Sequence, residues 1–110
     1  MPQLTVRGIR TQIMKEVSLK LIEELAFICE CGTDNFTVDG LQINSVFGGQ
    51  EVETFAFVEV AWFERGREVR DRVAEAITRH IQLAGIEDVE VAFKVYREDS
   101  YYVNGLACNQ

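Results

Sequence analysis

The feature that most restricts the fold is a strand–helix–strand pattern that occurs twice along the chain. Residues 11–31 place apolar side chains three and four positions apart, as one face of a helix does, and residues 67–84 do the same. Segments with the patterns of β-strands lie on both sides of each helix. The second copy begins roughly 55 residues after the first. We therefore predict an internal duplication, with pseudo-repeats at residues 2–50 and 54–105 of a single domain, 1–110.

Two such units side by side predict an α/β (α+β) fold with a four-stranded mixed sheet. Each parallel strand pair needs a right-handed crossover through its helix, so both helices should fall on one face of the sheet. Asp39-Gly40 should form a bulge, Gly32 should end the first helix, and residues 100–105 should form a short terminal strand ending in a turn. The strands expected in the sheet are residues 2–8, 36–47, 54–63 and 89–97.

Both faces of the expected strand 54–63 carry apolar side chains. The even-numbered residues Val58, Val60 and Trp62 share one face of the strand and are enough for the core under the helices. The odd-numbered residues Phe57, Ala61 and Phe63 share the opposite face, which no helix of the same chain would cover. A large exposed apolar face on a monomer is an association site, so we expect a homo-oligomer with these faces turned inwards.

Charge and cysteine content restrict the partners. The 18 acidic and 11 basic residues give a formal charge of -7, which leaves no basic face for nucleic acid. No apolar run approaches the ~20 residues that span a bilayer, and no signal peptide is visible, so we expect a cytoplasmic protein without membrane contact.

His80 is the only histidine, and Cys29, Cys31 and Cys108 do not complete a metal-ligand set. We predict reduced thiols, no metal and no cofactor.

The only proline of the chain directly follows Met1 and heads a strand in which Leu4 and Val6 share one face. If Met1 is removed, Pro2 becomes a secondary amine. An α-amino group has a reference pKa near ~8, which burial or neighbouring cations lower, so it can act as a general base. If Met1 stays, the nitrogen is a tertiary amide without a basic lone pair, and the proline only begins the strand. Whether Arg7, on the same strand, points at this site is open.

Together, the proline behind Met1, the duplicated unit, the uncovered sheet face and the length resemble the tautomerase superfamily, with its macrophage migration inhibitory factor-like fold. The residues 58–65 and 101–105 are similar to an uncharacterised bacterial branch of that superfamily. The resemblance implies homotrimers in which the three sheets surround a central channel and the helices lie outside. It also implies that an N-terminal proline acts as base or acid beside arginines that hold a substrate carboxylate.

The resemblance assigns roles to individual residues. Arg65 and Arg67 match a pair of arginines in decarboxylase-like members, and a guanidinium suits a carboxylate because it forms two parallel hydrogen bonds and keeps its charge. The alternatives are that Arg65 is a solvated residue at a strand end, that Arg67 only opens the helix, and that the tyrosines only pack the terminal strand. The resulting candidates are Pro2 as catalytic residue and Arg65, Arg67, Tyr101, Tyr102 and Asn104 as substrate-binding residues.

Two functions are compatible with these residues. The first is a tautomerase or isomerase that moves a proton on a small 2-keto or enol carboxylic acid, with Pro2 as general base and an arginine stabilising the enolate. The second is a non-catalytic homotrimer that binds a ligand or partner, because a fold does not carry a function by itself. A monomeric ferredoxin-like module is a third interpretation of the same pattern.

Overall fold

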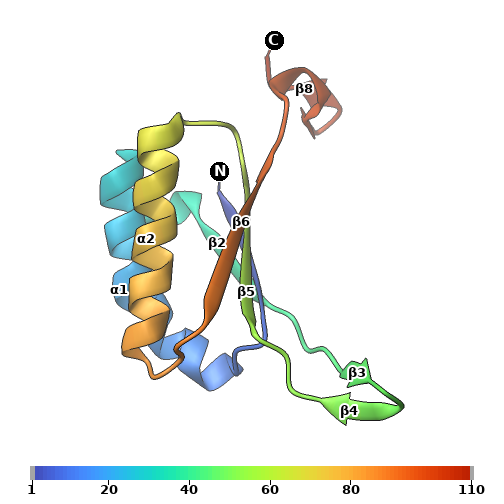
Figure 1. The fold of residues 1–110 in the computed structure, drawn as a ribbon. Helices are drawn as coiled ribbons and strands as arrows, with labels where there is room; N and C mark the ends of the chain where they lie inside the picture. Colours follow the sequence, from blue (N-terminus) through green and yellow to red (C-terminus); the bar gives the residue numbers. More distant parts are fainter. Residues whose placement is uncertain (1, 110) are drawn as a thin grey trace.

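The computed structural model describes residues 2–109. Its main body has two layers, a four-stranded mixed sheet and two helices that both cover the same face of it (Figure 1). The predicted fold class and the single helical layer are confirmed. The elements of this body are β1 (Gln3–Arg7), α1 (Thr11–Cys29), β2 (Thr37–Gly40), β5 (Ala56–Trp62), α2 (Arg67–Leu83) and β6 (Val89–Val95).

Strand β1 lies inside the sheet, whose order is β2-β1-β5-β6. It pairs parallel with β2 and antiparallel with β5, while β5 pairs parallel with β6. Each parallel pair is therefore the two ends of one strand–helix–strand unit, and the antiparallel pairing of β1 with β5 joins the two units. In that pairing Gln3 lies opposite Ala61 and Leu4 opposite Val60.

The core lies between the sheet and the helices. Alternate strand residues supply one side of it, so the expected assignment of Val58, Val60 and Trp62 to the helix side is confirmed. The helices supply the other side with stripes of apolar residues. Fully burying one leucine, isoleucine or valine side chain stabilises the fold by about 1.5–3 kcal/mol. The largest fully buried side chains on the helices are Leu21, Leu25, Ile77 and Ile81.

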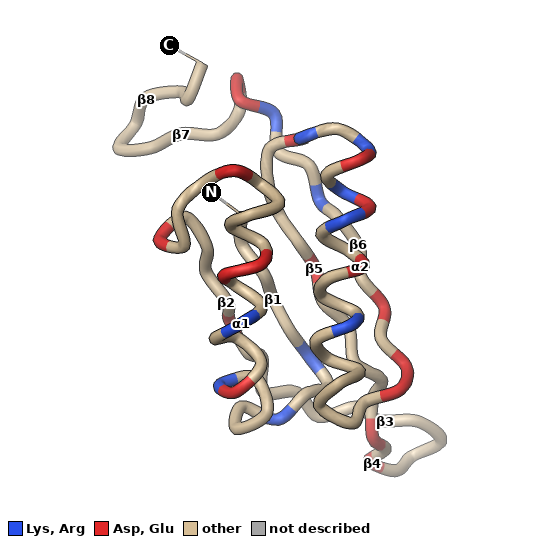
Figure 2. Tube along the Cα trace, turned by 90° about the vertical axis from the view of Figure 1, so that its left-hand side faces the viewer, with Lys and Arg blue, Asp and Glu red and all other residues tan. Residues whose placement is uncertain are grey.

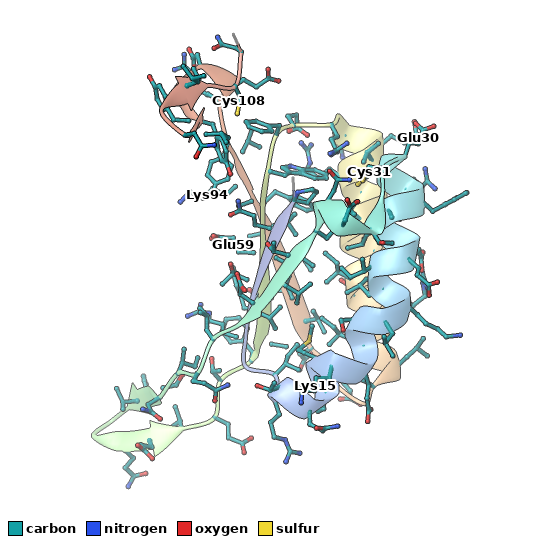
Figure 3. All side chains as sticks on the ribbon, turned by 180° about the vertical axis from the view of Figure 1, so that it is seen from behind. Lys15, Glu30, Cys31, Glu59, Lys94 and Cys108 are labelled. Atoms are coloured by element: carbon teal, nitrogen blue, oxygen red, sulfur yellow. The ribbon has the colours of Figure 1, made fainter. Side chains whose placement is uncertain are left out.

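The opposite face of the sheet is more polar than the apolar residues of β5 alone indicated. Ala61 is only 6% exposed in the single chain, and Phe57 is half-buried with the Arg7 guanidinium 5.0 Å from its ring centroid. Glu59 and Lys94 project from this face, away from the helices (Figure 3). The residues of one strand do not define this face, because the register also brings polar residues of β1 and β6 onto it.

The segment 36–47 was expected to form one strand with a bulge, and this prediction is wrong. Strand β2 ends at Gly40, and the chain then leaves the sheet to form a separate hairpin of β3 (Ser45–Phe47) and β4 (Gln50–Val52). Gly48 and Gly49 form its turn with φ of 62° and 78°, conformations that glycine adopts without strain. The pairing of β2 stops because its neighbour β1 ends at Arg7.

The first helix ends earlier than expected, and Gly32 does not cap it. Glu30 adopts the left-handed conformation with φ of 54°, whereas Gly32 has φ of -79°. The backbone N–H groups of Glu30 and Cys31 donate to carbonyls of the last helical turn, over 3.3 and 3.0 Å. Those bonds hold the left-handed residue in place. A single turn of 3-10 helix, Thr33–Asn35, then leads into β2.

The C-terminal segment forms a second hairpin in place of the expected single strand. After a 3-10 turn at Glu98–Ser100, β7 (Tyr102–Val103) pairs with β8 (Leu106–Ala107). Asn104 and Gly105 form the turn, with φ of 52° and 84°. This hairpin and the β3–β4 hairpin stand at opposite ends of the sheet (Figure 1).

Acidic and basic residues are interspersed along the two helices (Figure 2). Within residues 2–109, neither helix is both long enough and apolar enough to cross a membrane.

A cluster of charged and polar side chains joins the two helices. The carboxylate of Glu24 on α1 accepts hydrogen bonds from Arg79 and from Nε2 of His80 on α2, the latter over 2.8 Å. The hydrogen bond from Arg79, followed by that from His80, lowers the pKa of Glu24 below its ordinary value of 4.5. Glu75 also accepts from Arg79, over 2.9 Å. Glu24 thus links the helices across the outer edge of the core.

The lowered pKa of Glu24 predicts how acid affects stability. The folded state binds this proton less tightly than the unfolded chain, so the stabilisation is present above about pH 4.5 and is lost as the pH falls through the lower folded-state pKa. Glu24→Gln should lower Tm at pH 7 by about 2–4 °C and should weaken the fall of Tm below pH 4.5. Thermal unfolding followed by circular dichroism measures both effects. The exposed Glu23→Gln is the control, and an equal effect in the two variants would contradict the prediction.

Candidate active site

The candidate site lies at the end of the sheet where β1 begins and β5 and β6 end. Pro2 precedes β1 and is fully buried, and its carbonyl accepts a hydrogen bond from the N–H of Thr37 over 3.2 Å. Because Gln3 pairs with Ala61, continuing the antiparallel register by one residue places Pro2 opposite Trp62. Tyr96 donates its N–H to the carbonyl of Trp62 over 2.8 Å, which extends β6 to the same end. Met1 lies outside the described residues, so the structure does not test its removal.

Three aromatic rings form a cluster at this end of the sheet. The ring centroid of Tyr101 lies 5.1 Å from those of Phe63 and Tyr96, distances typical of edge-to-face and tilted aromatic pairs. The amide of Gln3 donates to the Tyr101 hydroxyl over 3.1 Å. Since that oxygen accepts from Gln3, the hydroxyl proton of Tyr101 remains free to donate to a ligand. Gln3 was not predicted, although its position beside Pro2 on the face opposite the core was visible in the alternation of the strand.

Arg65 lies on the helix side of the same sheet end. Its guanidinium carbon is 5.9 Å from the ring centroid of Trp62, and Nη1 donates to the carbonyl of Cys29 over 3.4 Å. The Cys29 carbonyl belongs to the last turn of α1, where carbonyls lack partners within the helix. Burial raises the pKa of the Cys29 thiol, and the charge of Arg65 opposes this increase. The structure therefore places the Arg65 side chain over Trp62, the residue that the register puts opposite Pro2.

Glu64 fixes the turn that carries Arg65. Its carboxylate accepts backbone N–H groups of Arg65 and Gly66, each over 3.1 Å, and the side chain of Arg70 over 2.8 Å. A carboxylate is favourable there because the N–H groups at the start of α2 lack partners within the helix. Sequence analysis missed this residue. The signal that could have found it is an acidic residue just before the first turn of a predicted helix.

The side chains of the other predicted residues are exposed to solvent in the single chain. Arg67 opens α2, its side chain is 85% exposed, and its Nε lies 3.6 Å from Asp71. Tyr102 is 64% exposed on the β7–β8 hairpin, and Asn104 occupies the turn of that hairpin. Arg7 ends β1, four residues after Gln3 and therefore about 13 Å along the strand, with its charge over Phe57. Pro2 is buried, Arg65 lies over Trp62 and Tyr101 binds Gln3 at this end of the sheet, whereas Arg67, Tyr102 and Asn104 are exposed and, within the described residues, no hydrogen bond links their side chains to that group.

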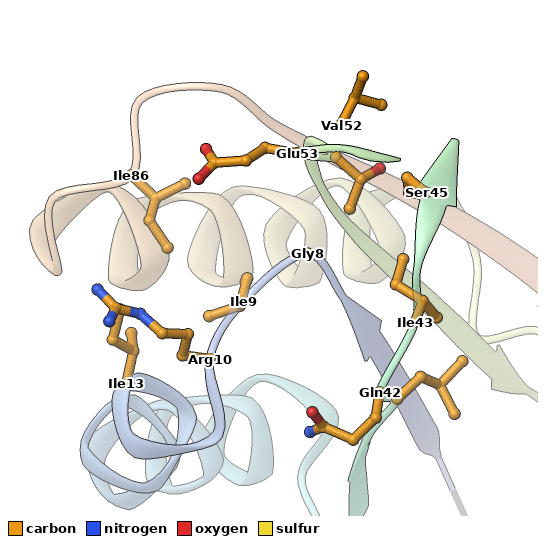
Figure 4. A pocket seen from close by; sticks show the side chains of 12 residues that line it. Gly8, Ile9, Arg10, Ile13, Gln42, Ile43, Ser45, Val52, Glu53 and Ile86 are labelled. Carbon is orange, nitrogen blue, oxygen red and sulfur yellow. The ribbon is translucent and has the colours of Figure 1, made fainter. Parts of the chain in front are cut away.

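A pocket of about 620 Å³ opens at the opposite end of β1 (Figure 4). Arg10 and Glu53 extend towards the same side of it as Ile86. None of the predicted site residues lines this pocket. The lining residues are Gly8, Ile9, Arg10, Ile13, Leu41, Gln42, Ile43, Ser45, Val52, Glu53, Thr54 and Ile86.

Metal-binding side chains do not converge anywhere in residues 2–109, where no group of three or more His, Cys, Asp or Glu residues is arranged to hold an ion. Cys29 is buried, and Cys31 and Cys108 are also free thiols.

The fold is that of tautomerase and macrophage migration inhibitory factor structures. A macrophage migration inhibitory factor-like protein from Entamoeba histolytica superposes with a TM-score of 0.71 at 13% identity, over 96% of this chain and 97% of that one. A wild-type fused 4-OT, described as an asymmetric trimer, gives a TM-score of 0.77 at 12% identity, over 97% of this chain and 96% of that one. At these identities the likeness shows the fold alone.

The chain belongs to the family described as a domain of unknown function, DUF1904, whose sequence model matches residues 1–107. A crystal structure of a member from Sebaldella termitidis superposes with a TM-score of 0.89 at 32% identity, over 97% of this chain and 99% of that one. No protein with curated annotation matches the sequence.

The contact between Gln3 and Tyr101 predicts how the C-terminal hairpin is held. Gln3→Ala removes this hydrogen bond, so amide exchange in residues 98–109 should become about three- to tenfold faster. Hydrogen exchange followed by mass spectrometry measures the rate. Gln12→Ala, an exposed glutamine on the first turn of α1, is the control and should leave those residues unchanged. Unchanged exchange in the Gln3 variant would show that the aromatic packing alone holds Tyr101.

Proposed function

We propose that this protein is a tautomerase-type enzyme that moves a proton between oxygen and carbon of a small 2-keto or enol carboxylic acid. The observation that carries the proposal is the position of Trp62. The strand register puts Pro2 opposite this residue, and the guanidinium of Arg65 lies over its ring. A potential base and a potential carboxylate ligand thus share one end of the sheet. The tautomerase-like fold supports the same reading, although fold alone does not define an activity.

Pro2 is proposed as the general base. This role requires removal of Met1, which turns the nitrogen of Pro2 into a secondary amine. Pro2 is fully buried, and burial favours the neutral amine over the protonated one. The neutral nitrogen would take the proton from the enol oxygen, and the protonated amine would return it to the adjacent carbon to give the 2-keto acid.

Arg65 is the better candidate for the substrate carboxylate than Arg67. Arg65 lies against Trp62 and makes one long hydrogen bond to a backbone carbonyl, whereas Arg67 projects into solvent beside Asp71. A guanidinium near the reacting atoms would also stabilise the negative charge of the enolate. The hydroxyl of Tyr101 supplies a further donor on the other side of the sheet end.

Ketonisation of phenylenolpyruvate, followed by absorbance, tests this assignment. N-terminal mass determination first establishes that Met1 is absent. Arg65→Ala should lower kcat/KM about ten- to a hundredfold, because a charge-assisted contact to the substrate is lost. Pro2→Ala keeps a primary amine, so activity should fall without vanishing.

Arg67→Ala is the matched control for Arg65→Ala, since it removes the same charge two residues away from an exposed position. It should retain most of the activity. If the Met1-free protein is no faster than buffer, or if the Pro2 and Arg65 variants both match it, the tautomerase assignment fails. A non-catalytic trimeric binding protein then becomes the better interpretation.

The assembly proposed for either function is a homotrimer. Both hairpins expose apolar side chains that their own chain does not cover, including Phe47 at 82% and Val46 at 71% on one, and Tyr102 at 64% and Leu106 at 65% on the other. A second copy of the chain is the partner we propose for them. The fused 4-OT relative in fold is described as a trimer, which supports this stoichiometry.

A pair of charge substitutions tests the trimer. Phe47→Asp should shift the mass from trimer towards monomer, because it places a charge where we propose that a neighbouring chain packs. Leu19→Asp is the control, since Leu19 is 73% exposed on a helix that would lie outside the trimer. Size-exclusion chromatography with light scattering gives the masses. A stable wild-type monomer at micromolar concentration, or equal effects of the two substitutions, would contradict the proposed assembly.

A further inference from the structure

Trp62 carries a buried hydrogen-bond donor without an acceptor. Its side chain is 1% exposed, and Nε1 is the one buried side-chain nitrogen or oxygen without a hydrogen-bond partner among residues 2–109. A buried donor that has lost its water and gained no acceptor destabilises the fold, so such atoms are rare and usually have a reason. The indole N–H can only donate, which means that the missing partner must be an acceptor.

The position of this donor points to the proposed substrate. Trp62 is the last residue of β5, and the strand register places Pro2 opposite it. One side of its ring packs against Phe93, with 5.0 Å between centroids, and the Arg65 guanidinium lies 5.9 Å from the ring centroid. The unpartnered N–H therefore belongs to the side chain that lies between the proposed base and the proposed carboxylate ligand.

Arg65 also has unused donor capacity. A guanidinium has five N–H groups, and the side chain of Arg65 makes one hydrogen bond, the 3.4 Å contact with the Cys29 carbonyl. Other arginines of the chain meet carboxylates, as Arg70 does with Glu64 over 2.8 Å and Arg97 does with Asp99. Among the described residues, no carboxylate forms an ion pair with Arg65. The chain has a formal charge of -7, so this is not explained by a shortage of acidic groups.

We infer that Trp62 is a substrate-binding residue whose indole N–H donates to the carboxylate that Arg65 holds. This inference rests on the proposed function and deepens it, because it defines the ligand as a small acid with an anionic oxygen at the edge of the indole. One carboxylate oxygen would accept from Arg65 and the other from Nε1 of Trp62. Such charge-assisted hydrogen bonds are stronger than neutral ones and would satisfy both groups at once.

The ligand reaches this donor by displacing the Arg65 side chain. Arg65 is exposed, and its bond to the Cys29 carbonyl is long, so a change of rotamer moves the guanidinium without breaking a strong contact. The guanidinium then exchanges a backbone carbonyl for a carboxylate.

The chain has one tryptophan, so its indole N–H gives a single resonance in a proton–nitrogen correlation spectrum. The full chain is titrated with pyruvate, a small 2-keto acid, and in parallel with acetone, which has the ketone but no carboxylate. Pyruvate should move the indole proton downfield in a saturable manner, as a new hydrogen bond does, and acetone should not. An indole resonance that stays unchanged up to roughly 100 mM pyruvate, about the weakest binding expected of a two-donor site, overturns the inference.

Variants separate a binding role from a purely structural one. Trp62→Phe removes the donor and keeps a ring, so pyruvate, followed by its own line broadening, should bind about tenfold more weakly. The smaller ring also leaves a cavity in the core, so Tm should fall, and the affinity is measured below the lowered Tm. Arg65→Ala should abolish the indole shift, and Arg67→Ala should leave it intact. If folded Trp62→Phe binds pyruvate as the wild type does, the unpaired N–H is only a packing defect and the inference is wrong.

The same experiment separates this inference from the proposed reaction. Pro2→Ala should retain the indole shift, because Pro2 is not a carboxylate ligand. A protein that shows the shift but does not ketonise phenylenolpyruvate would be a carboxylate-binding protein without the proposed activity. A protein that ketonises the substrate without any indole shift would keep its function and lose the proposed role of Trp62.

Discussion

The pairing of β1 with β5 is the interaction on which the rest of the structure depends. β1 has only five residues, yet it holds the two strand–helix–strand units together by pairing with β5 on one side and β2 on the other. Its register sends Leu4 and Val6 into the core and leaves the alternate residues on the opposite face. A shift by one residue would reverse both sets, so burial of the apolar pair fixes the register firmly.

That register also determines the candidate site. The β1–β5 pairing is antiparallel, so the beginning of β1 meets the end of β5, and Pro2 comes to the strand end that carries Trp62. The turn after β5 is held by Glu64, whose carboxylate binds two backbone N–H groups and thereby directs where the chain carries Arg65. The site is thus positioned by backbone pairing and by one capping carboxylate.

The two hairpins explain why a single chain leaves apolar surface uncovered. Each hairpin extends beyond an end of the sheet, where neither helix can cover it (Figure 1). The sheet face opposite the helices is a mixture, with Ala61 buried in the single chain and Glu59 and Lys94 projecting from the same face. The apolar contacts available to a neighbouring chain are therefore concentrated on the hairpins, whereas the sheet face would also require its charges to be matched.

The sequence by itself determined the number and order of the main elements. Apolar residues three and four positions apart on two segments, and alternating apolar residues on the strands, are local signals. They sufficed for the single helical layer, the core residues of β5 and the presence of a strand at the N-terminus, although that strand begins at Gln3 and not at Pro2. Local signals also indicated Arg65 and Tyr101, although only through resemblance to a family. The local signals placed the end of α1 too late. The helix ends at a left-handed Glu30 that is held by backbone hydrogen bonds, and a glutamate at this position is not a recognisable sequence signal for a helix end.

Tertiary structure alone decided how the candidate residues are placed relative to one another. Arg65 and Arg67 are equivalent in sequence, but the Glu64 turn directs one over Trp62 while the start of α2 directs the other into solvent. The contact of Gln3 with Tyr101 joins residues 98 positions apart, and the buried N–H of Trp62 without a partner likewise depends on how the folded chain packs around the indole. Periodicity fixes the face on which a residue lies. Which distant residue it meets there depends on strand register and turn geometry, which are properties of the folded chain.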